Sequence, residues 1–134
     1  MAGPILVGLI FADRVITEKN EKKGIIGTFT RFLSPQFPVV FPPWAIYAAV
    51  TEVDSEEHGF TLELVAEDGG DVVVPVEGKF RVEKRTDVAE LGVTVMGAVF
   101  PKAGRYKLTF KVDGHEVGTR VLLVDQVPSP GAET

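Results

Sequence analysis

The chain of 134 residues contains no cysteine. Disulfide bonds, thiolate metal sites and cysteine nucleophiles are therefore excluded, and we expect a cytoplasmic protein, because reducing compartments disfavour disulfides. Asparagine occurs once, and glutamine and methionine occur twice each. A scarcity of these thermolabile residues beside many glutamates is typical of proteins from thermophiles, and we expect a thermophilic source.

Long apolar runs are also missing. No run reaches the roughly 18 residues that a transmembrane helix requires. The longest run near the N-terminus, PILVGLIFA, has no Lys or Arg before it and is followed directly by Asp13 and Arg14, unlike a signal peptide. It predicts a buried strand, and we expect no association with membranes.

A basic surface is not indicated, because the formal net charge is −5. Two short groups of basic residues occur, and glutamates interrupt both. They are Lys19, Lys22 and Lys23, and further along Arg81, Lys84 and Arg85. Proteins that bind nucleic acids usually carry a basic excess or a continuous basic stripe. We therefore expect no nucleic-acid partner.

The two histidines lack the sequence context of a catalytic site. Neither a G-x-S-x-G motif for a nucleophilic serine nor a G-x-x-x-x-G-K-[ST] phosphate loop is present. His58 lies in the acidic segment DSEEHG (54–59), which could hold a divalent metal, but one short turn rarely supplies three converging ligands. We favour a solvated acidic turn there and expect His115 to be exposed. The sequence therefore predicts no cofactor, no metal and no enzymatic activity.

The apolar pattern predicts strand after strand. FTLELVA (60–66) alternates cleanly, with Phe60 and Leu62 on one face and Thr61 on the other. Pro75 cannot donate a ladder hydrogen bond, so its strand is expected at a sheet edge or bulge. Only TDVAELG (86–92) could form a single helical turn. Strands are expected over residues 5–11, 24–32, 44–53, 60–66, 72–77, 79–85 and 91–100, with a hairpin over 105–124.

The last hairpin has the clearest signal, because Asp113-Gly114 favours a type I′ turn. This turn places Val112 opposite His115, and the register then follows outward along both strands. The expected cross-strand pairs are Lys111 with Glu116, Phe110 with Val117, Leu108 with Thr119, and Tyr106 with Val121.

About eight or nine short strands separated by turns predict an all-β fold, namely an antiparallel β-sandwich of immunoglobulin-like type, with a β-barrel as the alternative. Residues 1–125 are expected to form this single domain. The segment QVPSPGAET (126–134) is short and proline-bearing, and is expected to be a mobile tail.

At this point the chain resembles a family of small bacterial all-β proteins whose function is not established. The resemblance rests on FADRV, KKGIIGTFTRFLSPQFPVVFPPW, EGKFRV and VFPKAGRYKLTFKVDGHEVGTRVLLV, and covers nearly the whole chain. Its most specific part is the Gly-Ile-Ile-Gly-x-Phe strand that runs into the Phe-Pro loop. The resemblance implies a β-sandwich and supplies no catalytic residues.

The segment SPQFPVVFPPW (34–44) interleaves four prolines with large aromatic residues. Each proline fixes its own φ and biases the preceding residue toward extended backbone, so the loop is expected to be stiff. Its aromatic residues either plug one end of the core or stay partly exposed as anchors for another subunit or a partner. The candidate binding residues are Phe37, Phe41, Trp44 and Tyr47.

Three functional hypotheses follow. The first is a non-enzymatic β-sandwich that acts through association, either as a homo-oligomer or with a partner protein. The second is a small-molecule or glycan-binding module with its ligand near Trp44 and Tyr47. The third, which the sequence favours least, is a metal-dependent hydrolase with its site at His58.

Overall fold

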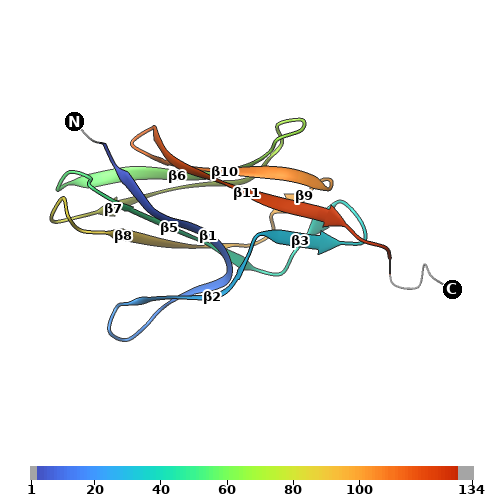
Figure 1. Ribbon diagram of the computed structural model, residues 1–134, viewed down its shortest axis with the longest axis horizontal. Coiled ribbons are helices and arrows are strands. Elements are labelled where there is room, and N and C mark those ends of the chain that lie inside the picture. The colour runs from blue at the N-terminus through green and yellow to red at the C-terminus, as the bar shows by residue number, and fades with distance from the viewer. Residues whose placement is uncertain (1–2, 130–134) are drawn as a thin grey trace.

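The computed structural model describes residues 3–129, and all regular structure in this range is β-strand (Figure 1). Two sheets lie face to face with the core between them, so the predicted β-sandwich is confirmed. The single helical turn that the sequence allowed at 86–92 does not form, because β8 (Ala89–Val95) occupies most of that segment. Within the same range, no helix is long and apolar enough to cross a membrane.

One sheet contains four antiparallel strands in the order β2-β1-β5-β8. In this sheet β2 spans Lys23–Phe29, β1 spans Ile5–Thr17 and β5 spans Trp44–Thr51. The second sheet has the order β3-β11-β10-β6-β7. Its strands are β3 (Arg31–Ser34), β11 (His115–Gln126), β10 (Gly104–Val112), β6 (Glu57–Ala66) and β7 (Val72–Arg81). The short strands β4 (Val39–Val40) and β9 (Val99–Phe100) pair separately at one end.

The chain passes from one sheet to the other at Thr30. The sequence predicted a single strand over 24–32, but β2 pairs with β1, whereas β3 pairs in parallel with β11. Phe29 and Phe32 are three residues apart, so a continuous strand would point them to opposite faces. The crossing instead brings the two ring centroids within 4.5 Å of each other in one aromatic cluster.

The core forms where the inward-facing side chains of both sheets meet. β6 follows the predicted alternation, with Leu62 and Leu64 buried and Glu63 exposed. Its alternating pattern begins earlier than predicted, since β6 starts at Glu57 and includes His58. The buried side chains contributed by β5 and β10 are Trp44, Ile46, Ala48, Val50, Tyr106, Leu108, Phe110 and Val112.

β5 is buried on both faces, because the β1–β2 hairpin bends over the outer face of its sheet. Figure 1 shows this hairpin leaving the plane of the sheet. Val15 of β1 lies so close to Gly92 of β8 that a Cβ at position 92 would be 2.7 Å from Val15 Cγ1. The outward residues Ala45 and Ala49 are accordingly buried as well.

The last hairpin has the predicted turn but not the whole predicted register. Val112 pairs with His115 and Lys111 with Glu116, as expected. A bulge between Phe110 and Lys111, with Val117 of β11 as the extra residue, then shifts the register by one residue. The predicted pairs Phe110–Val117, Leu108–Thr119 and Tyr106–Val121 are therefore wrong, and the observed pairs are Phe110–Gly118, Leu108–Arg120 and Tyr106–Leu122.

The bulge has a packing reason. It places Gly118 against Leu6 of the facing sheet, where a Cβ would lie 2.6 Å from Leu6 Cδ2. In the predicted register, the larger side chain of Val117 would occupy this inward position. The shift also turns Leu122 and Val124 into the core, where both are fully buried.

The predicted segments 72–77 and 79–85 are joined in one edge strand, β7, which ends at Arg81. Pro75 lies within it opposite Glu63, and its position in an edge strand agrees with the prediction from proline's missing N–H.

Gly27 of β2 is expected to tolerate no side chain. Its φ is 71°, and a Cβ there would collide with the carboxylate of Asp13. We expect Gly27→Ala to lower the free energy of unfolding by about 1–2 kcal/mol, measured by urea denaturation with the fluorescence of Trp44. Gly59→Ala is the control, because a Cβ at Gly59 meets nothing within 4 Å. Equal losses in the two variants would contradict this explanation.

Candidate functional site

Trp44 lies inside the end of the sandwich where β4 and β9 pair. Its side chain is only 3% exposed. Its ring is close to those of Phe11, Phe29, Phe32 and Phe100, at centroid distances of 5.5–6.4 Å. Trp44 therefore closes this end of the core from within and is almost completely shielded from solvent.

Phe37 and Phe41 lie between the core and solvent. The ring of Phe41 stacks on Phe32 at a centroid distance of 4.1 Å and meets Phe100 edge-on at 5.5 Å. Phe37 also packs against the core cluster, and both side chains remain partly exposed. The two rings thus have one side supported by the core and another available for contact.

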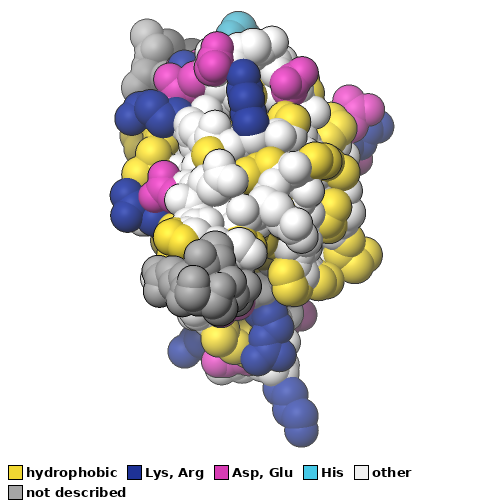
Figure 2. Space-filling view, turned by 90° about the vertical axis from the view of Figure 1, so that its right-hand side faces the viewer, with side chains coloured by type: hydrophobic (Ala, Val, Ile, Leu, Met, Phe, Trp, Pro, Cys, Tyr) yellow, Lys and Arg dark blue, Asp and Glu magenta, His cyan; other side chains and the backbone are white. Residues whose placement is uncertain are grey.

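The β4–β9 pair adds aliphatic surface beside these rings. Val40 lies opposite Val99, and both side chains are about half exposed. Figure 2 looks onto this end of the sandwich and shows hydrophobic side chains gathered along its right-hand side. We call the surface formed by Phe32, Phe37, Val40, Phe41 and Val99 the apolar end.

The loop that carries the apolar end is tied down by hydrogen bonds. The hydroxyl of the buried residue Ser34 donates to the carbonyl oxygen of Gln36 at 2.8 Å. The side-chain amide of Gln126 donates to the carbonyl of Pro35 at 3.2 Å, and the N–H of Val127 donates to the carbonyl of Ser34 at 3.0 Å. The start of the predicted tail 126–134 therefore holds this loop, and residues 130–134 lie outside the described range.

Tyr47 lies away from the apolar end, on the outer face of β5. The Tyr47 hydroxyl donates a hydrogen bond to Glu90 Oε2, and the ring lies 3.3 Å from the position of a Cβ on Gly8. Burial, the hydrogen bond to Glu90 and the Glu90 charge together raise the pKa of Tyr47 to about 12. The ring is largely covered, so it is not grouped with Phe37 and Phe41.

The prediction that His58 lies in a solvated acidic turn is wrong, because its side chain is buried. Its side chain is only 5% exposed, stacks on Phe80 and joins three segments of the chain. Nδ1 lies 2.6 Å from Asp113 Oδ2 in the β10–β11 turn, and Nε2 lies 2.8 Å from the carbonyl oxygen of Asp54. Since both partners are acceptors, both ring nitrogens donate, which is the arrangement of a charged imidazolium.

The groups around His58 favour its protonated, charged form. Burial lowers the pKa of His58, but the hydrogen bonds to Asp113 and Asp54 and the charges of Asp113 and Glu56 outweigh burial, so the pKa is raised above 6.5. The hydrogen bond from His58 in turn lowers the pKa of Asp113 below its usual 3.8. The arrangement is that of a structural clamp, because both imidazole nitrogens are occupied. His115, in the same turn, is exposed as predicted.

Metal-ligating side chains do not converge in the part of the chain described. Among residues 3–129, no group of three or more His, Cys, Asp or Glu side chains is placed to hold a metal ion. The acidic neighbours of His58 are spread over a solvated loop, and Arg85 binds two of the nearby carboxylates, Glu52 at 3.2 Å and Asp54 at 2.6 Å.

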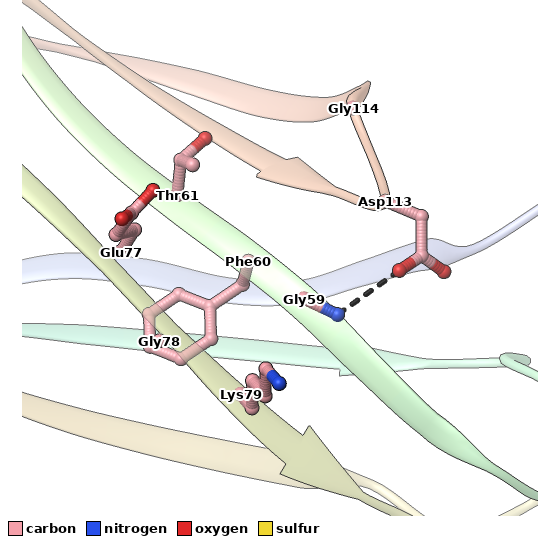
Figure 3. Close-up of a pocket in the computed structure, with 8 residues that line it drawn as sticks. All are labelled: Gly59, Phe60, Thr61, Glu77, Gly78, Lys79, Asp113 and Gly114. Carbon is pink, nitrogen blue, oxygen red and sulfur yellow. Dashed lines mark hydrogen bonds between the residues drawn. The ribbon is translucent and has the colours of Figure 1, made fainter.

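A hollow of about 450 Å³ lies on the outer face of β6 and β7, beside the β10–β11 turn (Figure 3). Gly59 and Gly78 form its floor, and Thr61, Glu77 and Lys79 surround them. One Asp113 oxygen accepts from the N–H of Gly59 at 3.0 Å, while the other faces His58. The Asp113 carboxylate and the Gly59 N–H are thus used within the fold, and the hollow lies at the opposite end of β10 from the apolar end.

A family model matches residues 8–125, which is most of the chain. The chain belongs to the family described as "Family of unknown function (DUF6941)". The predicted membership of an all-β family without an established function is therefore confirmed. No curated protein is similar in sequence to the chain.

Among the solved structures that match the chain, two come from Pseudomonas species. The alkylpurine DNA glycosylase AlkC of Pseudomonas fluorescens, bound to DNA containing an abasic site analogue, matches 92% of this chain with a TM-score of 0.52 at 7% identity. This chain spans only 31% of the glycosylase, and the likeness shows a fold alone. An immunoglobulin-like protein of Pseudomonas aeruginosa has a TM-score of 0.47 at 12% identity, covering 92% of this chain and 97% of that one.

Proposed function

We propose that the chain is a non-enzymatic β-sandwich that binds a partner protein through the apolar end. The observation that carries this proposal is the half exposure of Val40 and Val99 beside the partly exposed rings of Phe37 and Phe41. Apolar side chains gathered in this way mark interaction sites on soluble proteins. The partner is expected to insert an apolar side chain or segment among them.

The rigidity of the apolar end supports the proposal. Fixing a flexible loop on binding costs free energy, so a surface that is already fixed binds with less loss. Here the prolines restrict the backbone, and hydrogen bonds at Ser34, Pro35 and Gln126 hold the loop against β11. The aromatic cluster beneath Phe41 fixes the ring in place, as binding anchors require.

The alternative of a ligand site near Trp44 and Tyr47 has less support. Trp44 is enclosed in the core, and the Tyr47 hydroxyl is bound to Glu90. The hollow at Gly59 lies elsewhere, and Phe60 is the single aromatic residue among those that line it. Small-molecule sites usually combine an apolar cavity with a few unpaired polar groups.

Site-specific photocrosslinking tests the proposal. A photoreactive phenylalanine derivative at Val40 is expected to form a discrete heavier product in cells that make the full-length protein. The same derivative at Val7, which is equally exposed but lies on β1, is the control. Val99→Glu is expected to suppress the Val40 product, because a charge in the contact would be desolvated. Equal products from both positions, or an unchanged product in Val99→Glu, would rule out binding at the apolar end.

A further inference from the structure

β8 is an edge strand without the features that usually block pairing with another chain. Edge strands are protected by Lys, by Pro, by bulges or by being very short. The other outer strands of the two large sheets have such protection: Lys23 in β2, the four-residue length of β3, and Pro75 and Lys79 in β7. β8 contains no Lys, Arg or Pro, and its single charge, Glu90, is bound by Tyr47.

The residues that flank β8 are unusually exposed for apolar side chains. Val88 precedes the strand and is 48% exposed, and Met96 follows it and is 73% exposed. Within the strand, Leu91 and Val93 face the core but are only partly buried. A groove of about 260 Å³, lined mostly by apolar residues of β7 and of segment 94–98, runs beside the end of β8.

We propose that two copies of the chain associate by antiparallel pairing of their β8 strands, centred on Gly92. Such pairing is isologous, because a two-fold axis through Gly92 relates the two strands. It would join the two four-stranded sheets into one continuous sheet, with every side chain of β8 keeping its face.

The register centred on Gly92 is self-complementary. It places Met96 of one copy opposite Val88 of the other, so the two exposed apolar residues cover each other at both ends of the pair. Glu90 faces the neutral residue Thr94, so like charges are not opposed. Leu91 faces Val93 on the core side. The edge of β8 is therefore self-complementary in the character of its side chains.

β7 is the outer strand of the other sheet, next to β8, and it would not take part in the pairing. Pro75 lacks an N–H, and Glu77 and Lys79 project from the strand to solvent. The second sheets of the two copies would therefore end at β7, and the contact would be confined to β8 and the groove beside it. No residue of the apolar end lies in β8, so a substitution within β8 tests the pairing and leaves the side chains of the apolar end in place.

The pairing is tested by two substitutions at the exposed residue Thr94, with mass measured by analytical ultracentrifugation over a range of concentrations. The wild-type protein is expected to reach twice the chain mass of 14.5 kDa. Thr94→Glu places the new glutamate of each copy opposite Glu90 of the other copy. This repulsion occurs twice in the symmetric pair, and is expected to weaken dimerisation about tenfold. Thr94→Lys opposes Lys to Glu90 and is expected to maintain or strengthen it.

Two further variants separate the edge from the rest of the surface. Met96→Lys is expected to weaken dimerisation, because it removes the contact with Val88 of the second copy. Val7→Lys, on the exposed part of β1 two strands away, is expected to leave the mass unchanged. A monomer at every concentration would overturn the proposal, and so would a dimer that responds equally to Thr94→Glu and Thr94→Lys.

Discussion

Phe100→Ala is expected to lower the free energy of unfolding by about 3–5 kcal/mol. Phe100 is fully buried at the centre of the aromatic cluster. Its ring meets those of Phe32, Phe41, Trp44 and Tyr106 at centroid distances of 5.0–6.4 Å. Removing it leaves a cavity between the two sheets, and its stiff aromatic neighbours cannot close around the space.

The measurement is urea denaturation followed by the fluorescence of Trp44, the single tryptophan of the chain. Phe41→Ala is the matched control, because Phe41 belongs to the same cluster but is partly exposed. We expect it to cost about 1–2 kcal/mol, since less apolar area is removed from the protein interior. If both substitutions cost the same, the rings of the apolar end would be structural and the argument for a binding surface there would fail.

The sequence of the proline-rich segment predicted the stiffness of the loop but not which of its aromatic rings are buried. The alternation of Phe and Pro predicted a stiff loop that packs onto the body, and the loop does so. Which ring points inward depends on the partners that the fold brings to it. Trp44 is enclosed because Phe11 of β1 and Phe100 of β9 converge on it, and neither is close to it in sequence.

The strands were largely predictable because their signals are local. The alternation in 60–66 and the Asp113-Gly114 turn each specify backbone geometry within a few residues. The bulge between Phe110 and Lys111 was not predictable in this way, because its cause is the packing of Leu6 against Gly118 across the two sheets. The crossing at Thr30 has a similar origin, since it lets Phe29 and Phe32 share one cluster.

The clamp at His58 was missed although the sequence held a partial signal for it. His58 shares its parity with Phe60, Leu62 and Leu64, so extending the alternation by one step would have placed it inside. The acidic residues before it suggested a solvated turn instead. Its partner Asp113 is 55 residues away, and only the pairing of β6 with β10 brings the two together.

His58→Gln is expected to lower the free energy of unfolding by about 2 kcal/mol near neutral pH, because it removes a charge-assisted hydrogen bond and disturbs a buried contact. The effect is expected to be below that of a fully buried ion pair, since the side chain of Asp113 is about half exposed. Without the imidazole, the β10–β11 turn loses its tie to the loop that contains Asp54.

The dependence of stability on pH tests the hydrogen bonds of His58 specifically. The pKa of His58 is raised in the folded protein, so the folded state binds this proton more tightly than the unfolded state does. This contribution to stability is complete below the unfolded pKa of about 6.5 and is lost as the pH rises through the folded-state pKa. The wild-type protein is therefore expected to lose stability as the pH is raised from about 6.5 through that range, measured by urea denaturation.

His58→Gln should abolish this loss of stability, whereas His115→Gln should preserve it, because His115 is exposed and makes no hydrogen bond to Asp113 or Asp54.

On the acid side, the lowered pKa of Asp113 adds stability that is present above the usual pKa of Asp and is lost as the pH falls through the folded-state pKa. A wild-type protein whose stability does not change above pH 6.5, or a His115→Gln variant that loses the dependence, would show that folding does not favour the charged form of His58. Both hydrogen bonds of the imidazole would then need another explanation, since a neutral ring can donate only one of them.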